Sequence, residues 1–140
     1  MPAQKVNEVM THDPRTVDSG APLVEAAREM KEADAGAILV ADDGRFKGLV
    51  TDRDIVVRAI AEGKDPKSTT VGEICTSAAQ TLTPDSSVED AIRLMREHAI
   101  RRIPVVQDGR PVGIVAIGDL AIERDEDSAL ADISAARGNN

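Results

Sequence analysis

The sequence predicts a mixed α/β (α+β) fold in which two copies of one unit, related by a pseudo-twofold axis, pack sheet against sheet with their helices outside. The first observation is an internal repeat, because residues 6–55 match residues 71–120 at a constant offset of 65 residues without a gap. The second is that each copy combines helix-spaced apolar residues with two short apolar runs. The third is size, since one such unit would bury too little apolar surface to fold alone.

The repeat is the strongest signal in the chain. Chance does not easily place many identities on one diagonal, so the duplication outweighs every local pattern. Identical pairs at this offset include Thr11/Thr76, Ala26/Ala91, Met30/Met95, Gly48/Gly113 and Asp54/Asp119. We expect a first domain, a linker, a second domain and an acidic C-terminal tail at residues 5–63, 64–70, 71–124 and 125–140.

Each copy is expected to open with a short segment and an extended piece that lead into an amphipathic helix. The opening segments are residues 6–10 and 71–75, and the extended pieces are residues 16–17 and 81–82. Apolar residues at three- and four-residue spacing then give each helix a buried face. These residues are Leu23, Ala26, Ala27 and Met30 in the first copy and Val88, Ala91, Ile92 and Met95 in the second.

The starts of these helices are marked by residues that favour a helix N-terminus. In the first copy the helix is expected to begin at Ser19 or Pro22. In the second copy Ser86 or Asp85 can cap the helix, and Glu89 supports its first turn.

A β-hairpin is expected after each of these helices. Two apolar runs flank an Asp-Gly pair in each copy, and Asp-Gly is a strong signal for a tight hairpin turn. The runs are residues 37–41 and 46–50 around Asp43-Gly44, and residues 103–106 and 112–115 around Asp108-Gly109. In the first copy a helix over residues 54–62, closed by Gly63, is expected to follow the hairpin.

The composition argues against binding to nucleic acid. Phe46 is the only aromatic residue, and the formal net charge of the chain is −8. Nucleic acids are bound by clustered Lys and Arg and by aromatic stacking platforms, so general nucleic-acid binding is not expected. For the same reason a flat ligand ring would have to be held by aliphatic side chains and backbone.

The cysteine content and the N-terminus indicate a soluble, cytoplasmic protein. Cys75 is the only cysteine, so no intrachain disulfide can form. Residues 1–8 contain no apolar signal region, and no later apolar run is long enough to span a bilayer. Cys75 aligns with Met10, an apolar position, which favours packing over a redox role.

The stretch from Gly48 to Gly63 has the pattern of a ligand site. An apolar run ends in Thr51 and a spaced carboxylate, Asp54, before helical spacing begins. Such a corner at a sheet edge offers a ligand hydroxyl one donor/acceptor group and one acceptor. The alternative is structural: Thr51 or Asp52 caps the helix, and Asp54 is a first-turn residue favoured by the helix dipole.

Two motifs inside the repeat identify a family resemblance. They are Gly-Leu-Val-Thr-Asp-Arg-Asp, from Gly48 to Asp54, and Ile-Arg-Arg-Ile-Pro-Val-Val, from Ile100 to Val106. Both resemble motifs of paired CBS domains, known as Bateman modules, and so does the strand-helix-strand-strand-helix order of each copy. The resemblance covers nearly all of residues 5–123. The chain is also similar to stand-alone two-CBS proteins of actinobacteria in its size and in its Thr-Asp-Arg-Asp-Ile-Val stretch.

The resemblance implies that an adenosine-containing ligand binds in the cleft between the copies, without any required cofactor. Family ligands are AMP, ADP, ATP or sometimes S-adenosylmethionine. The Gly-x-x-Thr/Ser-x-x-Asp motif of the family contacts ribose, which implies this role for Thr51 and Asp54. A carboxylate suits neutral ribose hydroxyls. Family members hold phosphates with basic side chains before the first long strand, here Arg102, at the better-matching position, and Arg101.

The two copies depart from the family pattern in opposite ways. The second copy keeps the ribose carboxylate, Asp119, but has Ala116 where a hydroxyl is expected. The first copy has Gly36-Ala37 where the second has Arg101-Arg102. One lopsided site is therefore expected, with ribose on the first copy and phosphates on the second. The site at Asp119 is expected to be empty or weak.

These features favour a regulatory homodimer that senses an adenine nucleotide. The alternative is a ligand-free dimeric adaptor that acts through contacts with an effector protein. Catalysis is not expected, because the sequence shows no nucleophile–base pair, no acid–base pair of carboxylates and no phosphate-cradling glycine loop. His12 and His98 lack the spacing and partners of metal ligands, and no metal is expected.

Overall fold

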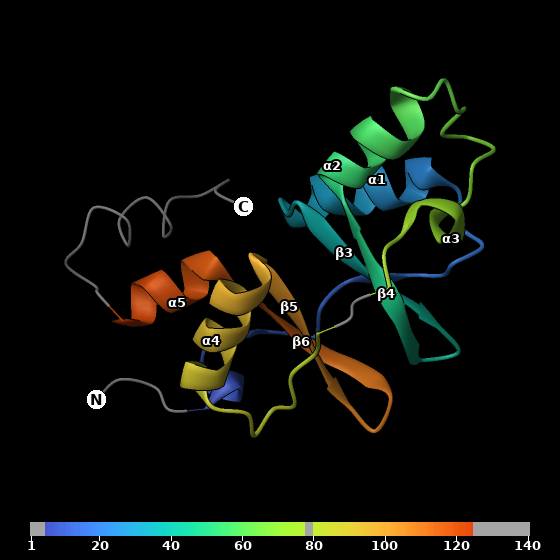
Figure 1. Cartoon of the computed structure of the whole chain (residues 1–140). Helices are drawn as coiled ribbons and strands as arrows, with labels where there is room; N and C mark the ends of the chain where they lie inside the picture. The colour runs from blue at the N-terminus through green and yellow to red at the C-terminus, as the bar shows by residue number, and fades with distance from the viewer. Residues whose placement is uncertain (1–4, 78–79, 125–140) are drawn as a thin grey trace. The chain divides into compact units, whose positions relative to one another are not determined.

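The computed structural model describes residues 5–77 and 80–124, which divide into two compact units. The expected tail at residues 125–140 lies outside the described residues. We call residues 15–77 and 109–111 the first-copy unit, and residues 5–14, 80–108 and 112–124 the second-copy unit. Each unit carries one three-stranded sheet, which confirms the mixed α+β fold class. Figure 1 shows the two long strands of each sheet, β3 with β4 and β5 with β6. Within the described residues, no helix is long and apolar enough to cross a membrane.

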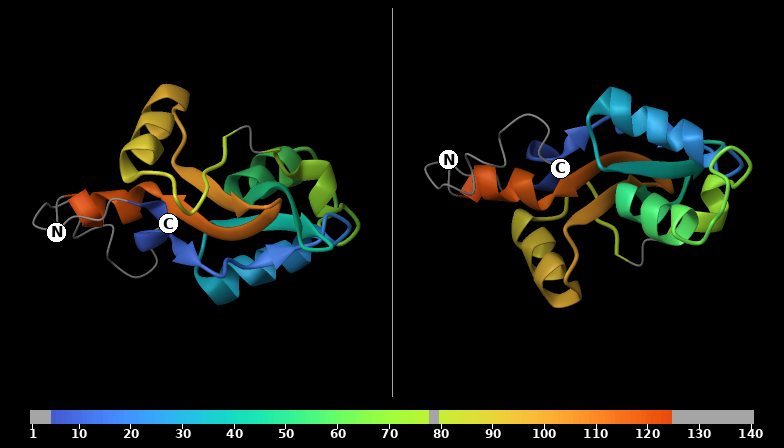
Figure 2. Two further views of the ribbon diagram at one scale, coloured as in Figure 1. Left: turned by 90° about the horizontal axis from the view of Figure 1, so that it is seen from below. Right: turned by 90° about the horizontal axis from the view of Figure 1, so that it is seen from above.

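The first-copy unit is built on a sheet with the strand order β2-β3-β4. β2 (Thr16–Val17) runs parallel to β3 (Ala37–Asp42), and β3 pairs antiparallel with β4 (Arg45–Thr51). The helical segments of this unit are α1 (Leu23–Ala33), α2 (Asp52–Asp54), η2 (Ile55–Ile60) and α3 (Val71–Ile74). α1 packs against β3 (Figure 2), and α3 contacts η2.

The second-copy unit is built on a sheet with the strand order β1-β6-β5. β1 (Thr11–His12) pairs antiparallel with β6 (Arg110–Ala116), which is also bonded to β5 (Arg102–Gln107). The first two residues of β6 are grouped with the first-copy unit. The helical segments are η1 (Val6–Glu8), α4 (Val88–His98) and α5 (Ile117–Arg124). α4 contacts both β5 and α5.

Both hairpin turns adopt the conformation that an Asp-Gly pair favours. Asp43 and Gly44 have φ angles of 52° and 78°, and Asp108 and Gly109 have φ angles of 53° and 78°. Two successive residues with positive φ are typical of a type I′ turn, whose twist matches that of the flanking strands. The two predicted hairpins are therefore confirmed.

The opening segment of each copy, together with the threonine that follows it (Thr11 or Thr76), belongs to the unit of the other copy. In the second-copy unit Thr11 pairs with Ile114 of β6. In the first-copy unit the repeat-equivalent Thr76 pairs with Leu49 of β4. Equivalent backbone bonds of 2.8 Å hold both segments, from Val6 N to Ser86 O and from Val71 N to Ala21 O. Each compact unit is therefore discontinuous in sequence.

Each unit has its own aliphatic core, and the one aromatic residue, Phe46, is only partly buried. The buried residues of the two long helices are Leu23, Ala26 and Met30 of α1 and Val88, Ala91 and Met95 of α4. The predicted helix faces are confirmed except at their edges. Ala27 is exposed because it lies about 100° around the helix from Ala26, and Ile92 is only partly buried.

The expected cap of α4 at Ser86 or Asp85 is wrong by one residue. Ser87 is the N-cap, and its Oγ accepts a hydrogen bond from Asp90 N at 3.0 Å. Ser86 Oγ instead accepts from Thr83 N at 3.0 Å, so this hydroxyl stabilises the turn before the helix. A sequence with two adjacent serines does not show which of them the turn uses.

The first helix begins after Pro22, which is one of the two predicted starts. Ser19, the other, bonds to Asp42 instead: its N–H and its hydroxyl donate to the carboxylate at 2.9 and 2.7 Å. These two bonds hold the pKa of Asp42 below its ordinary value, and the bond from the hydroxyl has the larger effect.

The helix after the first hairpin is formed by α2 and η2 together. It begins at Asp52, two residues earlier than predicted, and Ile55–Ile60 form a π-helix rather than a continuous α-helix. Gly63 has a φ of 76°, and its N–H donates to Ile60 O at 3.0 Å. The predicted glycine-terminated end of this helix is therefore confirmed.

Candidate functional site

The Thr51–Asp54 corner lies where β4 ends and α2 begins. Asp54 N–H donates to Thr51 Oγ1 at 3.1 Å, and Thr51 N–H donates to Asp54 Oδ2 at 2.9 Å. This reciprocal pair is a capping box, which confirms the structural alternative for both residues. The Thr51 hydroxyl proton and Asp54 Oδ1 take no part in the box, so one donor and one acceptor remain for a ligand.

The equivalent corner of the second copy keeps the carboxylate but lacks the hydroxyl. Ala116 N–H donates to Asp119 Oδ2 at 2.8 Å, which reproduces one half of the capping box. Asp119 is half-buried in the first turn of α5. This burial raises the pKa of its carboxyl, although the bond from Ala116 acts in the opposite direction.

Arg101 and Arg102 lie at the entry to β5, in the same unit as the second corner. The Arg101 carbonyl accepts from Ile117 N–H at 2.9 Å, which joins the start of β5 to the start of α5. The Arg101 side chain is exposed, whereas Arg102 is half-buried and already has an interaction partner. In the first-copy unit the equivalent bond runs from Asp52 N to Gly36 O at 2.9 Å. Gly36 and Ala37 carry no charged side chain there.

The predicted site residues are thus divided between the two units. The structure brings Thr51 and Asp54 together in the first-copy unit, while Asp119, Arg101 and Arg102 belong to the second-copy unit. The assignment of one ligand to residues of both copies stays a prediction.

The glycine that opens each corner motif is required by a close approach of backbone. A Cβ on Gly48 would lie 2.6 Å from the carbonyl oxygen of Thr76, and a Cβ on Gly113 would lie 3.0 Å from that of Thr11. Thr76 and Thr11 are the equivalent residues that directly follow the two exchanged opening segments. Gly48 therefore serves the fold, because a side chain there would displace the Thr76 backbone, whereas an added Cβ at Gly113 would first meet the side chain of Met10.

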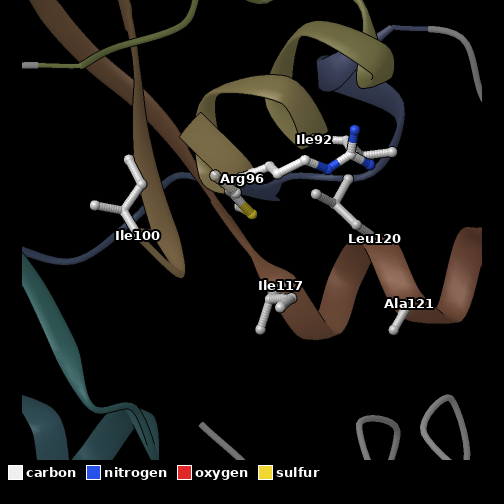
Figure 3. A pocket seen from close by; sticks show the side chains of 7 residues that line it. Ile92, Arg96, Ile100, Ile117, Leu120 and Ala121 are labelled. Atoms are coloured by element: carbon white, nitrogen blue, oxygen red, sulfur yellow. The ribbon is translucent and has the colours of Figure 1, made fainter. Parts of the chain in front are cut away.

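Two features near the corners are not predicted from the sequence. Arg58 of η2 donates to Ile74 O at 2.7 Å and to Thr76 Oγ1 at 3.1 Å, which anchors the helix of the first corner. In the second-copy unit, α4 and α5 line an apolar pocket of about 350 Å³ (Figure 3). A residue-by-residue comparison of the copies is the signal that could have located this pocket, since Ile117 stands where the first copy has Asp52.

The two histidines and the cysteine lie in different surroundings. His12 and His98 are exposed, and His12 Nε2 lies 2.8 Å from Asn7 O. Cys75 packs at the edge of the first-copy core, and burial raises the pKa of its thiol despite the nearby positive charge of Arg58. Among residues 5–77 and 80–124, no three His, Cys, Asp or Glu side chains lie together as a metal site.

A sequence model of the CBS domain matches residues 6–60 and 71–125. This double match agrees with the duplicated fold and the paired corners, and the chain belongs to the CBS-domain family. Among its relatives, the CBS domain-containing protein YhcV of Bacillus subtilis strain 168 is 42% identical over 133 residues, or 92% of this chain and 94% of that protein. Hypoxic response protein 1 of Mycobacterium tuberculosis is 40% identical over 100 residues, or 71% of this chain and 70% of that protein, which confirms the similarity to an actinobacterial CBS-pair protein.

Solved structures of CBS proteins share the fold. The crystal structure of Hypoxic Response Protein I with two coordinated zinc ions has a TM-score of 0.76 and 36% identity, covering 84% of this chain and 96% of that one. The CBS domain pair of protein MJ0100, in complex with 5-methylthioadenosine and S-adenosyl-L-methionine, has a TM-score of 0.76 and 30% identity, covering 86% of this chain and 94% of that one. The zinc ions and the adenosine derivatives belong to those two proteins.

Proposed function

We propose that this protein is a non-enzymatic regulatory module that binds an adenosine-containing ligand and acts as a sensor. The observation that carries the proposal is the Thr51–Asp54 corner, which keeps one hydroxyl donor and one carboxylate oxygen available beside each other. A CBS pair of the same fold is bound to two adenosine derivatives, which supports this ligand class. The proposed ligands are AMP, ADP and ATP, with S-adenosylmethionine as a further option.

The chemistry of the first corner suits ribose better than phosphate. A carboxylate accepts hydrogen bonds from neutral hydroxyls, whereas a phosphate would bring a second negative charge to Asp54. We therefore assign ribose to Thr51 and Asp54, and phosphates to Arg102 and Arg101. Asp119 is assigned a second ribose position that is weaker or empty, because its corner has no hydroxyl.

Regulation would follow if the ligand has different affinities for two arrangements of the protein. A ligand that binds one arrangement of the copies or protomers more tightly than another shifts the population toward that arrangement. On this proposal the protein is a cytoplasmic homodimer, and an effector protein binds it according to its arrangement. Neither nucleic acid nor membrane has a role.

Calorimetric titration with AMP, ATP and S-adenosylmethionine tests the proposal. Thr51→Ser keeps the hydroxyl and is expected to bind like the wild type. Thr51→Val removes it and is expected to weaken binding about 10-fold, which corresponds to roughly 1.4 kcal/mol for one hydrogen bond. The proposal fails if the wild type binds none of the three ligands, or if the serine and valine variants bind equally well.

A ligand-free dimeric adaptor is the second candidate. The capping box favours it, because Thr51 and Asp54 have a structural role without any ligand. The absorbance of the purified protein separates the two candidates. The chain has no Trp and no Tyr, so bound nucleotide would give a clear excess at 260 nm. A spectrum without this excess, together with titrations that show no binding, would favour the adaptor.

A further inference from the structure

The pocket between α4 and α5 lies entirely within the second-copy unit, and we call it the α4–α5 pocket. Its volume is about 350 Å³, and Figure 3 shows the side chains around it. Its lining includes Ile92, Arg96, Ile100, Ile117, Leu120 and Ala121. Ile117 is 51% exposed although it is a large aliphatic residue. An open apolar hollow of this size is a place where another apolar group binds.

The apolar lining of the pocket is specific to the second copy. Its isoleucines stand where the first copy has two alanines and an aspartate, in the pairs Ile92/Ala27, Ile100/Ala35 and Ile117/Asp52. The second copy is also the one whose last helix, α5, leads directly into the tail at residues 125–140. The isoleucines therefore occur in the copy that lies next to the tail in the chain.

The tail lies outside the described residues, but its sequence favours a short amphipathic helix over residues 129–136. Ser128 is a good N-cap, and Gly138 suits the position just after a helix end. Helical spacing places four apolar residues on one side, namely Ala129, Leu130, Ile133 and Ala136. A helix of this length is marginal in water by itself, so its apolar side needs a surface to pack against.

The connection between α5 and this stretch is long enough to bring it back to the pocket. Four residues, 125–128, separate Arg124 at the end of α5 from Ala129. Four extended residues span about 13 Å, whereas Leu120 lies only about 6 Å back from Arg124 along the helix axis. A tether this short gives an effective concentration in the millimolar range, so a small apolar contact is enough to hold the stretch in place.

The charges of the tail and of the pocket are complementary. Asp132 lies four residues before Ala136, which places it beside the apolar side of the expected helix. Arg96 is exposed at the pocket, and within residues 5–77 and 80–124 it makes no ion pair. A tail packed in the pocket would therefore bring a carboxylate near a guanidinium.

We propose that residues 129–136 pack into the α4–α5 pocket of their own chain, with Leu130 and Ile133 against its isoleucines and Asp132 near Arg96. The contact would support α5, because Leu120 is the only buried side chain among those described for this helix. It goes beyond the proposed ligand function and does not depend on it. The tether favours this occupant over a second copy or a small apolar ligand, and both of these are outcomes of the tests below.

Nuclear magnetic resonance of the whole chain with labelled methyl groups tests the contact directly. Nuclear Overhauser contacts are expected from the methyl groups of Leu130 and Ile133 to those of Ile92 and Ile117. A mixture of labelled and unlabelled chains, measured with isotope filtering, separates contacts within one chain from contacts between two chains. The expected contacts are all within one chain.

Thermal melts of the whole chain measure what the contact contributes. The tail variant Leu130→Ala with Ile133→Ala is expected to lower the Tm by about 5 °C, because it removes apolar contacts with the pocket. Ala131→Ser with Ala135→Ser is the matched control, since it changes two residues on the other side of the expected helix. This control is expected to melt within about 1 °C of the wild type.

A pocket variant shows whether the tail acts through the pocket. Ile100→Ala inserts the residue type of the first copy, and in this background the tail substitutions are expected to lower the Tm by less than in the wild type. If circular dichroism shows that Ile100→Ala is not folded, the charge exchange of Asp132→Arg with Arg96→Asp replaces it. Each single change is then expected to lower the Tm, and the double change is expected to restore it.

Four results would overturn the contact. They are a spectrum without contacts between tail and pocket, contacts found only between different chains, a tail variant that melts like the wild type, and equal losses of Tm in the wild-type and pocket-variant backgrounds. Contacts between chains would identify a second copy as the occupant, and a pocket unaffected by the tail substitutions would favour a small ligand. The tail variant keeps Thr51 and Asp54, so its titration with AMP tests the ligand proposal separately.

Discussion

Gly48 and Gly113 occupy equivalent positions, yet the atoms that they face differ in rigidity. A Cβ at Gly48 would meet the Thr76 carbonyl oxygen at 2.6 Å, whereas a Cβ at Gly113 would first meet the flexible side chain of Met10. Gly48→Ala is expected to lower the free energy of unfolding by about 1–3 kcal/mol, because backbone must move. Gly113→Ala is expected to cost less. Urea unfolding of the two variants measures the difference.

Gly20 provides the control for these two glycines. It is exposed, and an added Cβ would have no atom within 4 Å. Gly20→Ala is expected to leave the free energy of unfolding unchanged or to raise it slightly, since alanine restricts the unfolded chain. A loss at Gly20 as large as that at Gly48 would contradict the role of the close backbone approach.

The raised pKa of the half-buried Asp119 carboxyl predicts a pH-dependent stability. Burial raises its pKa in the folded chain, so its contribution to stability is fully present below the ordinary value of 3.8 and is lost as the pH rises through the folded pKa. Asp119→Asn keeps an oxygen for the Ala116 N–H and removes the charge. Without ligand, the variant is expected to melt above the wild type at neutral pH, and this advantage is expected to vanish below pH 3.8.

Thermal melts of both proteins across this pH range are the measurement. A variant that melts below the wild type at neutral pH would show that the Asp119 charge stabilises the fold. It would then be the bond from Ala116, and not burial, that dominates at this corner.

At the scale of elements, the structure corrects the predicted N-cap of α4 from Ser86 or Asp85 to Ser87. Ser87→Ala removes the acceptor for Asp90 N–H and is expected to lower the free energy of unfolding by about 1 kcal/mol. Ser87→Asp keeps an oxygen at the N-cap and is expected to lose much less. Chemical unfolding monitored by circular dichroism compares the two. Equal losses would mean that the bond to Asp90 N–H does not stabilise α4.

The hairpins and long helices could be predicted because their signals are local. An Asp-Gly pair determines its own turn, and residues spaced like Leu23, Ala26 and Met30 share a helix face wherever the helix packs. The exchange of opening segments could not be predicted in this way. Thr11 and Thr76 are the same residue type at equivalent positions of the repeat, so neither residue indicates which copy its segment packs against.

The candidate site could be predicted only where its residues are close in the chain. Thr51 and Asp54 are three residues apart, and the capping box that joins them follows from that spacing. Only a comparison of the two copies gives a sequence signal for the α4–α5 pocket, and the pocket itself depends on how two helices separated by a hairpin pack together. The exposure of Ile117 is a result of that packing and has no local signal.

At the scale of the whole molecule, the two copies keep one fold but have diverged in their surfaces. The first copy has the Thr51 hydroxyl and three exposed aliphatic residues on η2, and the second has the Arg101–Arg102 pair and the α4–α5 pocket. The buried residues of α1 and α4 remain equivalent throughout. The two copies therefore differ in the side chains that they offer to a ligand or partner, while the buried faces of their long helices occupy the same repeat positions.

Ala116→Thr tests whether the missing hydroxyl is what makes the second corner weaker. Asp119 already accepts from the residue 116 N–H at 2.8 Å, so a threonine there can complete the capping box by accepting from Asp119 N–H. The ligand-free variant is expected to gain about 1 kcal/mol of stability from this cap. It is also expected to bind a further equivalent of AMP in calorimetry, because the new corner offers the same donor and acceptor as Thr51 and Asp54.

Ala116→Val, which has the shape of threonine without its hydroxyl, is the control and is expected to gain neither the stability nor the additional binding. A threonine variant that is more stable but binds no additional AMP would show that the hydroxyl caps the helix without creating a ligand site, and would weaken the ribose assignment of the first corner by the same argument.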